Sequence, residues 1–216
     1  WSYVSSGSIG SVAANADGTV YLTETIFTVT NQIPTNQTPA PGRADSSIVG
    51  LDGRTGAVRF RRSLPNGSAQ WPQETEGGDC VSPLYHDGGS LGPISVLENG
   101  DAAVQQAVQH FRHKGGCPAW AGTGPLFRQV TLSVWRVSPS GALTVTTVRD
   151  HAGEWPIAGE RPGDEDYFAG VNRPDGHGGV LSTWQLAATD GQHGQVSRVA
   201  GGAVVFTQPA AWAQYY

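Results

Sequence analysis

The feature that most constrains the fold is a short hairpin signal, in which a glycine-containing turn separates two apolar runs. The clearest example is the turn at 17–18, Asp-Gly, which follows a short apolar run at 12–14. Residues 19–22, Thr-Val-Tyr-Leu, come next and have the β-branched and aromatic bias of a strand. An Asp-Gly pair between two such runs is a strong signal for a β-hairpin.

A second hairpin signal follows a long polar insert at 27–45. The apolar run at 48–51 leads into a glycine-rich turn at 52–56, and after it Val58 and Phe60 share one face of an alternating strand. The insert holds three prolines and several polar residues, which is typical of a surface loop. Two hairpins in succession predict a four-stranded antiparallel meander over residues 8–65.

Two fainter copies of this meander follow, over residues 93–149 and 167–208. Each copy has a turn at both hairpin positions, namely Asn99-Gly100, 138–141, Asp175-Gly176 and Gly201-Gly202. The chain is also rich in turn residues, with 30 Gly and 14 Pro among 216 residues, and no amphipathic helical stretch stands out. We therefore predict an all-β chain with about three repeats and long inserts, forming a single domain over 1–216 or part of a larger one.

The first repeat carries a resemblance to a known family. Its segments GSVAANADGTVYL and SSIVGLDGRTGAVRF, with WSY in front, resemble a repeat of the PQQ-like (quinoprotein-type) β-propeller family. The resemblance implies a β-propeller, or a partial propeller, of four-stranded antiparallel blades. It implies a fold rather than a function, because propellers serve as enzymes, receptors and scaffolds. The family's quinone enzymes bind their cofactor across an eight-bladed ring, some with adjacent cysteines. Cys80 and Cys117 are not adjacent, so we predict no cofactor.

Three repeats are fewer than the four to eight blades of typical propellers. The chain also has no Met and begins with Trp1. We therefore expect a fragment of a larger propeller, or a ring that an additional chain or further blades complete. Residues 1–4 are expected to form a strand that closes the fold by pairing with a C-terminal strand near 203–207.

Charge and hydrophobicity exclude two classes of partner. A net charge of −5 and a pI of about 5.6 argue against nucleic acid, because phosphate binding requires a basic face. No apolar run approaches the roughly 20 residues of a membrane span. The densest basic cluster, Arg59, Arg61 and Arg62, is expected to be solvated and to protect the end of an edge strand.

The two cysteines, Cys80 and Cys117, both fall in predicted loops. An even pair in loops is compatible with one disulfide in an oxidising compartment, and two free thiols are the alternative. The glycosylation sequons at Asn36 and Asn66 are also compatible with an extracellular setting. We therefore predict an extracytoplasmic protein, whether secreted, periplasmic or at the cell surface.

The predicted binding residues are aromatic or histidine side chains in the long loops, where residues 66–92 show little periodicity. They are Trp71, Tyr85, His86, Trp120 and Trp155. An exposed aromatic ring with polar neighbours stacks on a sugar or anchors a protein partner, and folding over the sheet faces is the alternative. Trp135 and Trp184 lie in predicted strands and are expected in the core.

No catalytic motif stands out. The spacing of His110, His113 and Cys117 fits no closed zinc pattern, so no metal site is predicted. The acidic run at 164–166 is expected to be a solvated loop. We therefore predict a non-catalytic binding or structural module with a protein or carbohydrate partner.

Two alternatives to the non-catalytic propeller module remain open. The first is a carbohydrate-active hydrolase or lyase on the same scaffold, using loop carboxylates such as Glu74, Glu76 and Asp79. The second is a lectin-like β-sandwich, which differs from a propeller in its strand count and in lacking radial repetition.

Overall fold

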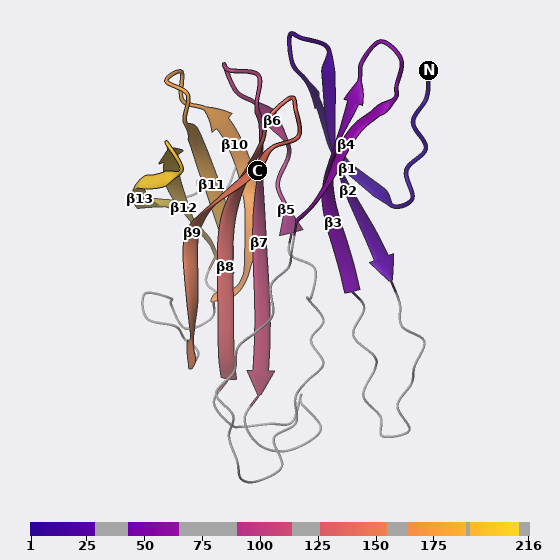
Figure 1. The fold of residues 1–216 in the computed structure, drawn as a ribbon. Coiled ribbons are helices and arrows are strands. Elements are labelled where there is room, and N and C mark those ends of the chain that lie inside the picture. The colour runs from indigo at the N-terminus through magenta and orange to yellow at the C-terminus, as the bar shows by residue number, and fades with distance from the viewer. Residues whose placement is uncertain (29–42, 65–89, 114–125, 155–163, 189–190, 212–216) are drawn as a thin grey trace, which may run out of the picture.

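The computed structural model describes residues 1–28, 43–64, 90–113, 126–154, 164–188 and 191–211 (Figure 1). Within these ranges the chain is all-β and its strands form three antiparallel sheets, which confirms the all-β part of the predicted fold class. The same ranges contain no helix of the length and apolar character that crossing a membrane requires.

The first and third sheets each have four strands in chain order. The strands of the first sheet are β1 (Ser8–Ala14), β2 (Thr19–Thr28), β3 (Arg43–Asp52) and β4 (Val58–Leu64). Those of the third sheet are β10 (Asp164–Pro174), β11 (Val180–Ala188), β12 (Gly191–Ala200) and β13 (Ala203–Ala211). Both are simple meanders, as successive hairpin turns dictate.

The second sheet has the same plan with a divided first strand. Its strands are β5 (Ser90–Leu91), β6 (Ser95–Val96), β7 (Ala102–His113), β8 (Leu126–Val137) and β9 (Leu143–Glu154). Both β5 and β6 pair with β7, so together they take the place of one strand. Pro93 lies in the interruption between them, where it removes no ladder hydrogen bond.

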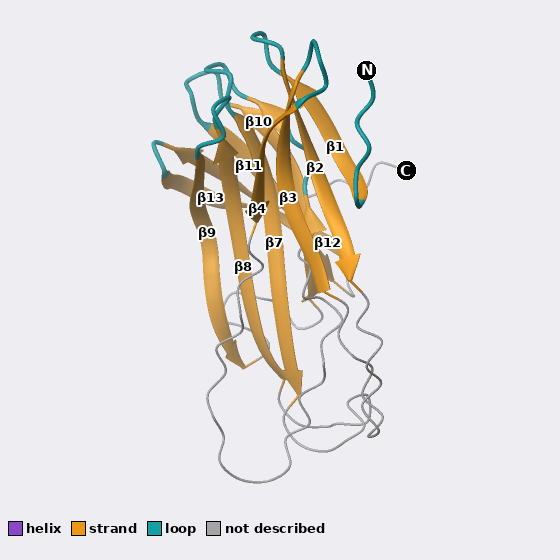
Figure 2. Cartoon of the chain, turned by 45° about the vertical axis from the view of Figure 1, so that its right-hand side comes forward, coloured by secondary structure: helices purple, strands orange, loops and turns teal. Residues whose placement is uncertain are grey.

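The three sheets stack face to face in chain order (Figures 1 and 2). Apolar side chains from facing sheets fill each interface, which follows from the alternation of inward and outward residues along each strand. Between the first and second sheets lie Tyr21, Ile48, Phe60, Leu64, Ile94, Ala102, Val104, Trp135 and Val137. Between the second and third lie Ala107, Val130, Leu132, Val134, Trp184 and Val199. Trp135 and Trp184 are thus core residues, as predicted.

Two predictions about strand limits are wrong. Residues 1–5 form no strand, and β13 pairs with β12 rather than with the N-terminal segment, so the expected closure between 1–4 and 203–207 does not occur. The insert at 27–45 is also shorter than predicted, because β2 and β3 continue as a ladder to the pair Thr28 and Arg43. The rest of that insert lies outside the described residues.

Candidate functional site

The two ends of the stacked sheets differ in how the strands are joined. At one end lie the short turns that join β1 to β2, β3 to β4, β6 to β7, β8 to β9, β10 to β11 and β12 to β13 (Figures 1 and 2). We call it the turn end. Strands β2, β4, β7 and β9 finish at the opposite end, where the chain leaves the described part; we call this the loop end. Pairs such as His113 and Leu126 mark where the chain departs and returns.

The predicted binding residues and cysteines belong to segments that start at the loop end. Trp71, Cys80, Tyr85, His86, Cys117, Trp120 and Trp155 all lie outside the described residues. The structure nevertheless fixes where their segments begin: 65–89 follows β4, 114–125 follows β7, and 155–163 follows β9. All three therefore leave the sheets at one end.

The turn end is built from one repeated hairpin. In four turns the N–H of the first residue donates to a carbonyl four residues later, over 2.8 to 3.1 Å. The four pairs are Asn15–Thr19, Leu97–Asp101, Ser138–Ala142 and Asp175–Gly179. The residue before each acceptor is a glycine at positive φ, namely Gly18, Gly100, Gly141 and Gly178, as three-residue hairpin loops require. The third-sheet counterpart of Gly18 is therefore Gly178, two residues beyond Gly176, which the Asp175-Gly176 turn signal predicts.

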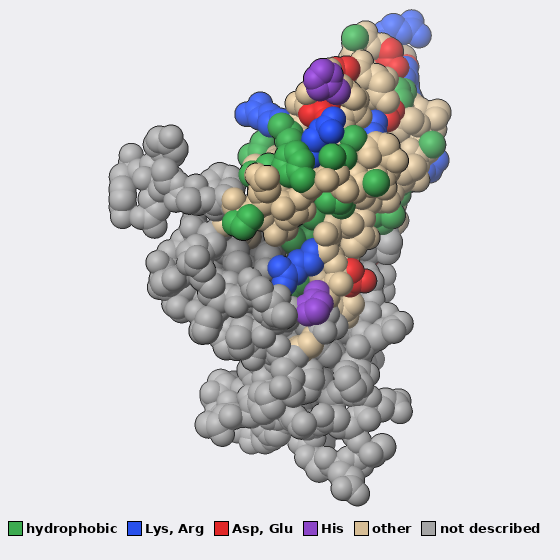
Figure 3. Space-filling model, turned by 90° about the vertical axis from the view of Figure 1, so that its left-hand side faces the viewer, with side chains coloured by type: hydrophobic (Ala, Val, Ile, Leu, Met, Phe, Trp, Pro, Cys, Tyr) green, Lys and Arg blue, Asp and Glu red, His purple; other side chains and the backbone are tan. Residues whose placement is uncertain are grey.

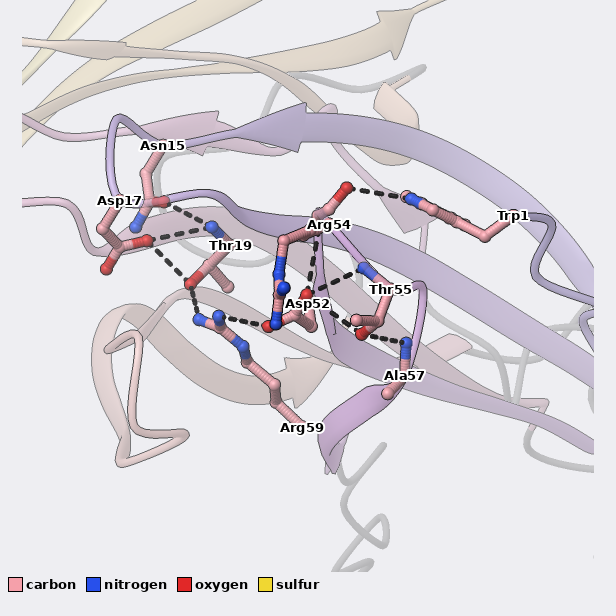
Figure 4. A network of polar contacts seen from close by, with 10 residues as sticks. Trp1, Asn15, Asp17, Thr19, Asp52, Arg54, Thr55, Ala57 and Arg59 are labelled. Carbon is pink, nitrogen blue, oxygen red and sulfur yellow. Dashed lines mark hydrogen bonds and ion pairs between the residues drawn. The ribbon is translucent and has the colours of Figure 1, made fainter.

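A polar network ties the two turns of the first sheet together (Figure 4). The Asp17 carboxylate accepts hydrogen bonds from the Thr19 N–H at 2.9 Å and the Thr19 hydroxyl at 2.8 Å, which lower its pKa. Arg59 donates to the Thr19 hydroxyl at 2.6 Å and to Asp52 at 2.8 Å. Arg59, and then the Thr55 N–H and hydroxyl, hold the pKa of Asp52 well below its usual range. Both carboxylates are thus stabilised as anions, unlike a general acid, whose pKa lies near neutrality.

The other two sheets use an Arg–Asp pair at the same end. Arg136 of β8 pairs with Asp101 at 3.1 Å, and Arg198 of β12 pairs with Asp175 at 2.6 Å. Burial raises the pKa of Asp175, but the N–H groups of His177 and Gly179, together with Arg198, outweigh it and lower the pKa to about 2. The carboxylates of Asp101 and Asp175 therefore also have a structural role, since each pairs with an arginine of its own sheet.

Hydrogen bonds at the turn end link each sheet to the next. The Gly100 carbonyl of the second sheet accepts from the Tyr21 hydroxyl at 2.8 Å and from the Asn15 amide at 3.0 Å. Burial, followed by nearby acidic groups, raises the pKa of Tyr21 to about 12, so its hydroxyl stays a donor. The Gly176 N–H of the third sheet donates to Glu98 of the second at 2.9 Å. The turn end is therefore a continuous hydrogen-bonded rim.

The arginine cluster lies on β4, which is an edge strand of the first sheet, and Arg59 and Arg61 are exposed there. The three arginines also make specific contacts, which the expectation of a solvated or edge-protecting strand end does not include. Besides Arg59, Arg62 donates to the Gly141 carbonyl of the second sheet at 2.6 Å, and its guanidinium lies 5.7 Å from the centre of the Phe60 ring. Arg61 forms an ion pair with Glu24 on the outer face of the first sheet. Such contacts give each arginine a structural role.

Glu24 fastens the N-terminal segment, residues 1–6, to the outer face of the first sheet. Its carboxylate accepts from the Ser5 hydroxyl, from the Ser6 N–H at 3.1 Å and from the Tyr3 hydroxyl at 3.4 Å, while Arg61 donates to Tyr3 at 2.7 Å. The sequence analysis missed this site. The available signal was a charged residue in the apolar strand of residues 19–28, which alternation alone assigns to a solvated face.

The described residues contain no group of three or more His, Cys, Asp or Glu side chains placed to hold a metal ion. The 164–166 run, predicted as a loop, opens β10 instead. Comparison with known proteins adds no assignment: no family model, no curated protein and no solved structure matches the chain.

Proposed function

We propose that this chain is a non-catalytic, extracytoplasmic binding or structural module on a propeller-like scaffold, whose contact surface lies at the loop end. The observation that carries the proposal is the separation of short turns and long connections to opposite ends of the sheets. A rigid scaffold that directs its long connections to one side is a common arrangement for binding proteins.

The propeller part of the proposal is supported by the blade-like plan of the sheets. Each has its strands in chain order, and successive sheets pack face to face with hydrogen bonds between their turns. The binding part is supported by the chemistry of the turn end. The carboxylates there, Asp17, Asp52, Asp101 and Asp175, are all engaged by groups of the fold, which favours the loop end as the contact surface. The partner is a carbohydrate or a protein that stacks on loop aromatics.

An array of soluble neutral and acidic polysaccharides tests the binding proposal. Once a binding polysaccharide is found, Trp71→Ala, Trp120→Ala and Trp155→Ala are each expected to weaken binding by about two- to tenfold, since stacking on a ring is worth about 0.5–1.5 kcal/mol. The matched control replaces 29–42 with Asn-Gly. Thr28 and Arg43 are a paired end of the ladder that a two-residue turn can join, and none of the candidate aromatics lies in this segment.

Two results would contradict the proposal. Binding that survives all three Trp substitutions would place the contact elsewhere. Release of reducing sugar that Glu74→Gln or Asp79→Asn abolishes would instead establish the carbohydrate-active enzyme.

The compartment is tested by the intact mass without reductant, since a Cys80–Cys117 disulfide lowers that mass by about two hydrogens relative to the reduced chain.

A further inference from the structure

The two interfaces between sheets use equivalent strand positions. In both interfaces, the earlier sheet in the chain presents the same one of its two faces to the later sheet. Four residues after the last residue of each first turn, a polar residue lies opposite a β-branched one. These pairs are Thr23 with Ile48, Gln105 with Val134, and Thr183 with Val196. In the first and second sheets this row faces the next sheet in the chain. We call the surface that contains the row the forward face of each sheet.

The forward face of the third sheet has no sheet on it in the described part of the chain. Ile48 and Val134 are 0 % and 1 % exposed because the next sheet covers them, whereas Val196 is only partly buried. Phe206, which is joined to the same face through its pairing with Arg198, is 38 % exposed. Figure 3 shows hydrophobic side chains gathered on this side of the molecule.

A second position on the forward face repeats as well. Ser11 of β1 accepts a hydrogen bond from the Ile94 N–H of the next sheet at 2.9 Å. Its counterpart in the third sheet is Val171, since the N–H groups of Ser11 and Val171 donate to equivalent threonines, Thr23 and Thr183. Val171 is 41 % exposed. An apolar side chain thus stands uncovered where the first sheet makes an interface contact.

Two arginines mark the edge of the forward face at the turn end. Arg136 lies opposite Ala103, pairs with Asp101 of its own sheet and reaches the Gly178 carbonyl of the next sheet at 3.4 Å. Arg198 lies opposite Leu181, the corresponding position of the third sheet. It pairs with Asp175 through Nε and Nη2, and its Nη1 has no partner among the described residues. The third sheet therefore carries an arginine in the position that Arg136 uses to reach the next sheet.

The first sheet carries the complementary surface. Within the interfaces, a forward face packs against rows such as Ala102–Val137 and Val104–Trp135 of the following sheet. The equivalent rows of the first sheet, Val20–Leu51 and Leu22–Val49, lie on its outer face. Among the described residues, Tyr3 of the N-terminal segment packs against this cluster. That segment pairs with no strand, and Trp1 within it is 62 % exposed.

We propose that two copies of this chain associate head to tail, with the forward face of each third sheet docked on the outer face of the partner's first sheet. The N-terminal segment moves aside to admit it. Two such contacts related by a twofold axis close a ring of six sheets, a number within the range of propellers. The assembly goes beyond the proposed function, because it uses the sheet faces and does not depend on a ligand at the loop end.

Sedimentation velocity on the full chain from 1 to 100 µM tests the assembly. A species of twice 22.6 kDa is expected at the upper concentrations. Phe206→Glu and Val196→Glu should raise the dimer dissociation constant at least tenfold. Ser5→Ala, which loosens the N-terminal segment, should lower it several-fold. Val145→Glu, at an exposed valine of the second sheet, is the control and should leave it unchanged. Far-UV circular dichroism establishes that each variant is folded.

A photo-crosslinker at position 206 tests the direction of docking. Crosslinks to residues 20–24 or 47–51 of a partner chain would support the head-to-tail contact. Crosslinks between two third sheets would overturn it, as would a chain that stays monomeric at 100 µM. Species that keep growing beyond two copies would overturn the closed ring. A folded Phe206→Glu variant that still dimerises like the unmodified chain would show that the forward face is not the contact.

Discussion

The side chain of Glu24 is completely buried on the outer face of the first sheet, and its carboxylate is paired with the guanidinium of Arg61, whose side chain is 39 % exposed. The pair holds a segment that belongs to no strand against a sheet that would otherwise expose Leu22, Val49 and Leu51. Polar contacts at this position thus protect an apolar surface.

Replacing Glu24 with Ala is expected to lower the free energy of unfolding by about 2 kcal/mol. The change removes the acceptor of the Ser6 N–H and one of the two acceptors of the Ser5 hydroxyl, which also donates to the Gly7 carbonyl. Because Arg61 is partly exposed, water limits the additional cost of unpairing it. Urea unfolding measures the loss. Arg54→Ala is the control, since the Arg54 side chain is exposed and has no hydrogen bond among the described residues. Equal stabilities of the Glu24→Ala and Arg54→Ala variants would contradict the role given to Glu24.

Stability should fall as the pH decreases from about 4 to about 2. Asp175 has a folded pKa of about 2, below the value of about 3.9 in an unfolded chain. A depressed pKa contributes stability above the unfolded value, and that contribution is lost as the pH falls through the folded value. Thermal midpoints of the wild type and Asp175→Asn should therefore differ at pH 6 and converge towards pH 2. A difference that stays constant with pH would show that the charge of Asp175 contributes nothing.

Gly141→Ala should be more destabilising than Gly18→Ala. Both glycines have φ of +85°, so alanine at either position pays about 1 kcal/mol of backbone strain. A Cβ at Gly18 would meet nothing within 4 Å, whereas a Cβ at Gly141 would lie 2.8 Å from the Phe60 ring. The clash should add about 1–2 kcal/mol. Denaturant midpoints of the two variants give the difference in stability. A double variant, Gly141→Ala with Phe60→Leu, should recover part of the stability that the clash removes.

Trp135→Phe should destabilise the protein by about 1 kcal/mol more than Trp184→Phe. The Trp135 ring N–H donates to the buried Gln106 amide oxygen at 2.8 Å, whereas that of Trp184 is buried with no partner among the described residues. The two substitutions remove similar volume, so the comparison isolates one buried hydrogen bond. Calorimetric unfolding of both variants checks the order, and the reverse order would mean that packing at Trp184 outweighs that bond.

The turns could be predicted from the sequence because their requirement is local. Gly18, Gly100 and Gly141 adopt positive φ, which glycine tolerates without strain, and each stands between two apolar runs. Which of Gly176 and Gly178 corresponds to Gly18 is decided by the hydrogen bond from the Asp175 N–H to the Gly179 carbonyl. The residue types of this turn do not reveal that bond.

Long-range pairing could not be predicted in the same way. Trp1, Tyr3 and Val4 have the composition of a strand, but the partners that hold this segment are Glu24 and Arg61, two residues from different strands. The binding residues depend on segments outside the described part, so Trp71, Tyr85, His86, Trp120 and Trp155 stay predictions.

The meander order of the strands affects how the polypeptide folds during its synthesis. Apart from the pairing of β5 with β7, every strand pairing in the described ranges joins strands that are adjacent in the sequence. Each sheet is therefore complete soon after its last strand leaves the ribosome, without waiting for distant segments. Under tension applied at the two termini, the same order should release the sheets one at a time, giving a stepwise rather than an all-or-none extension.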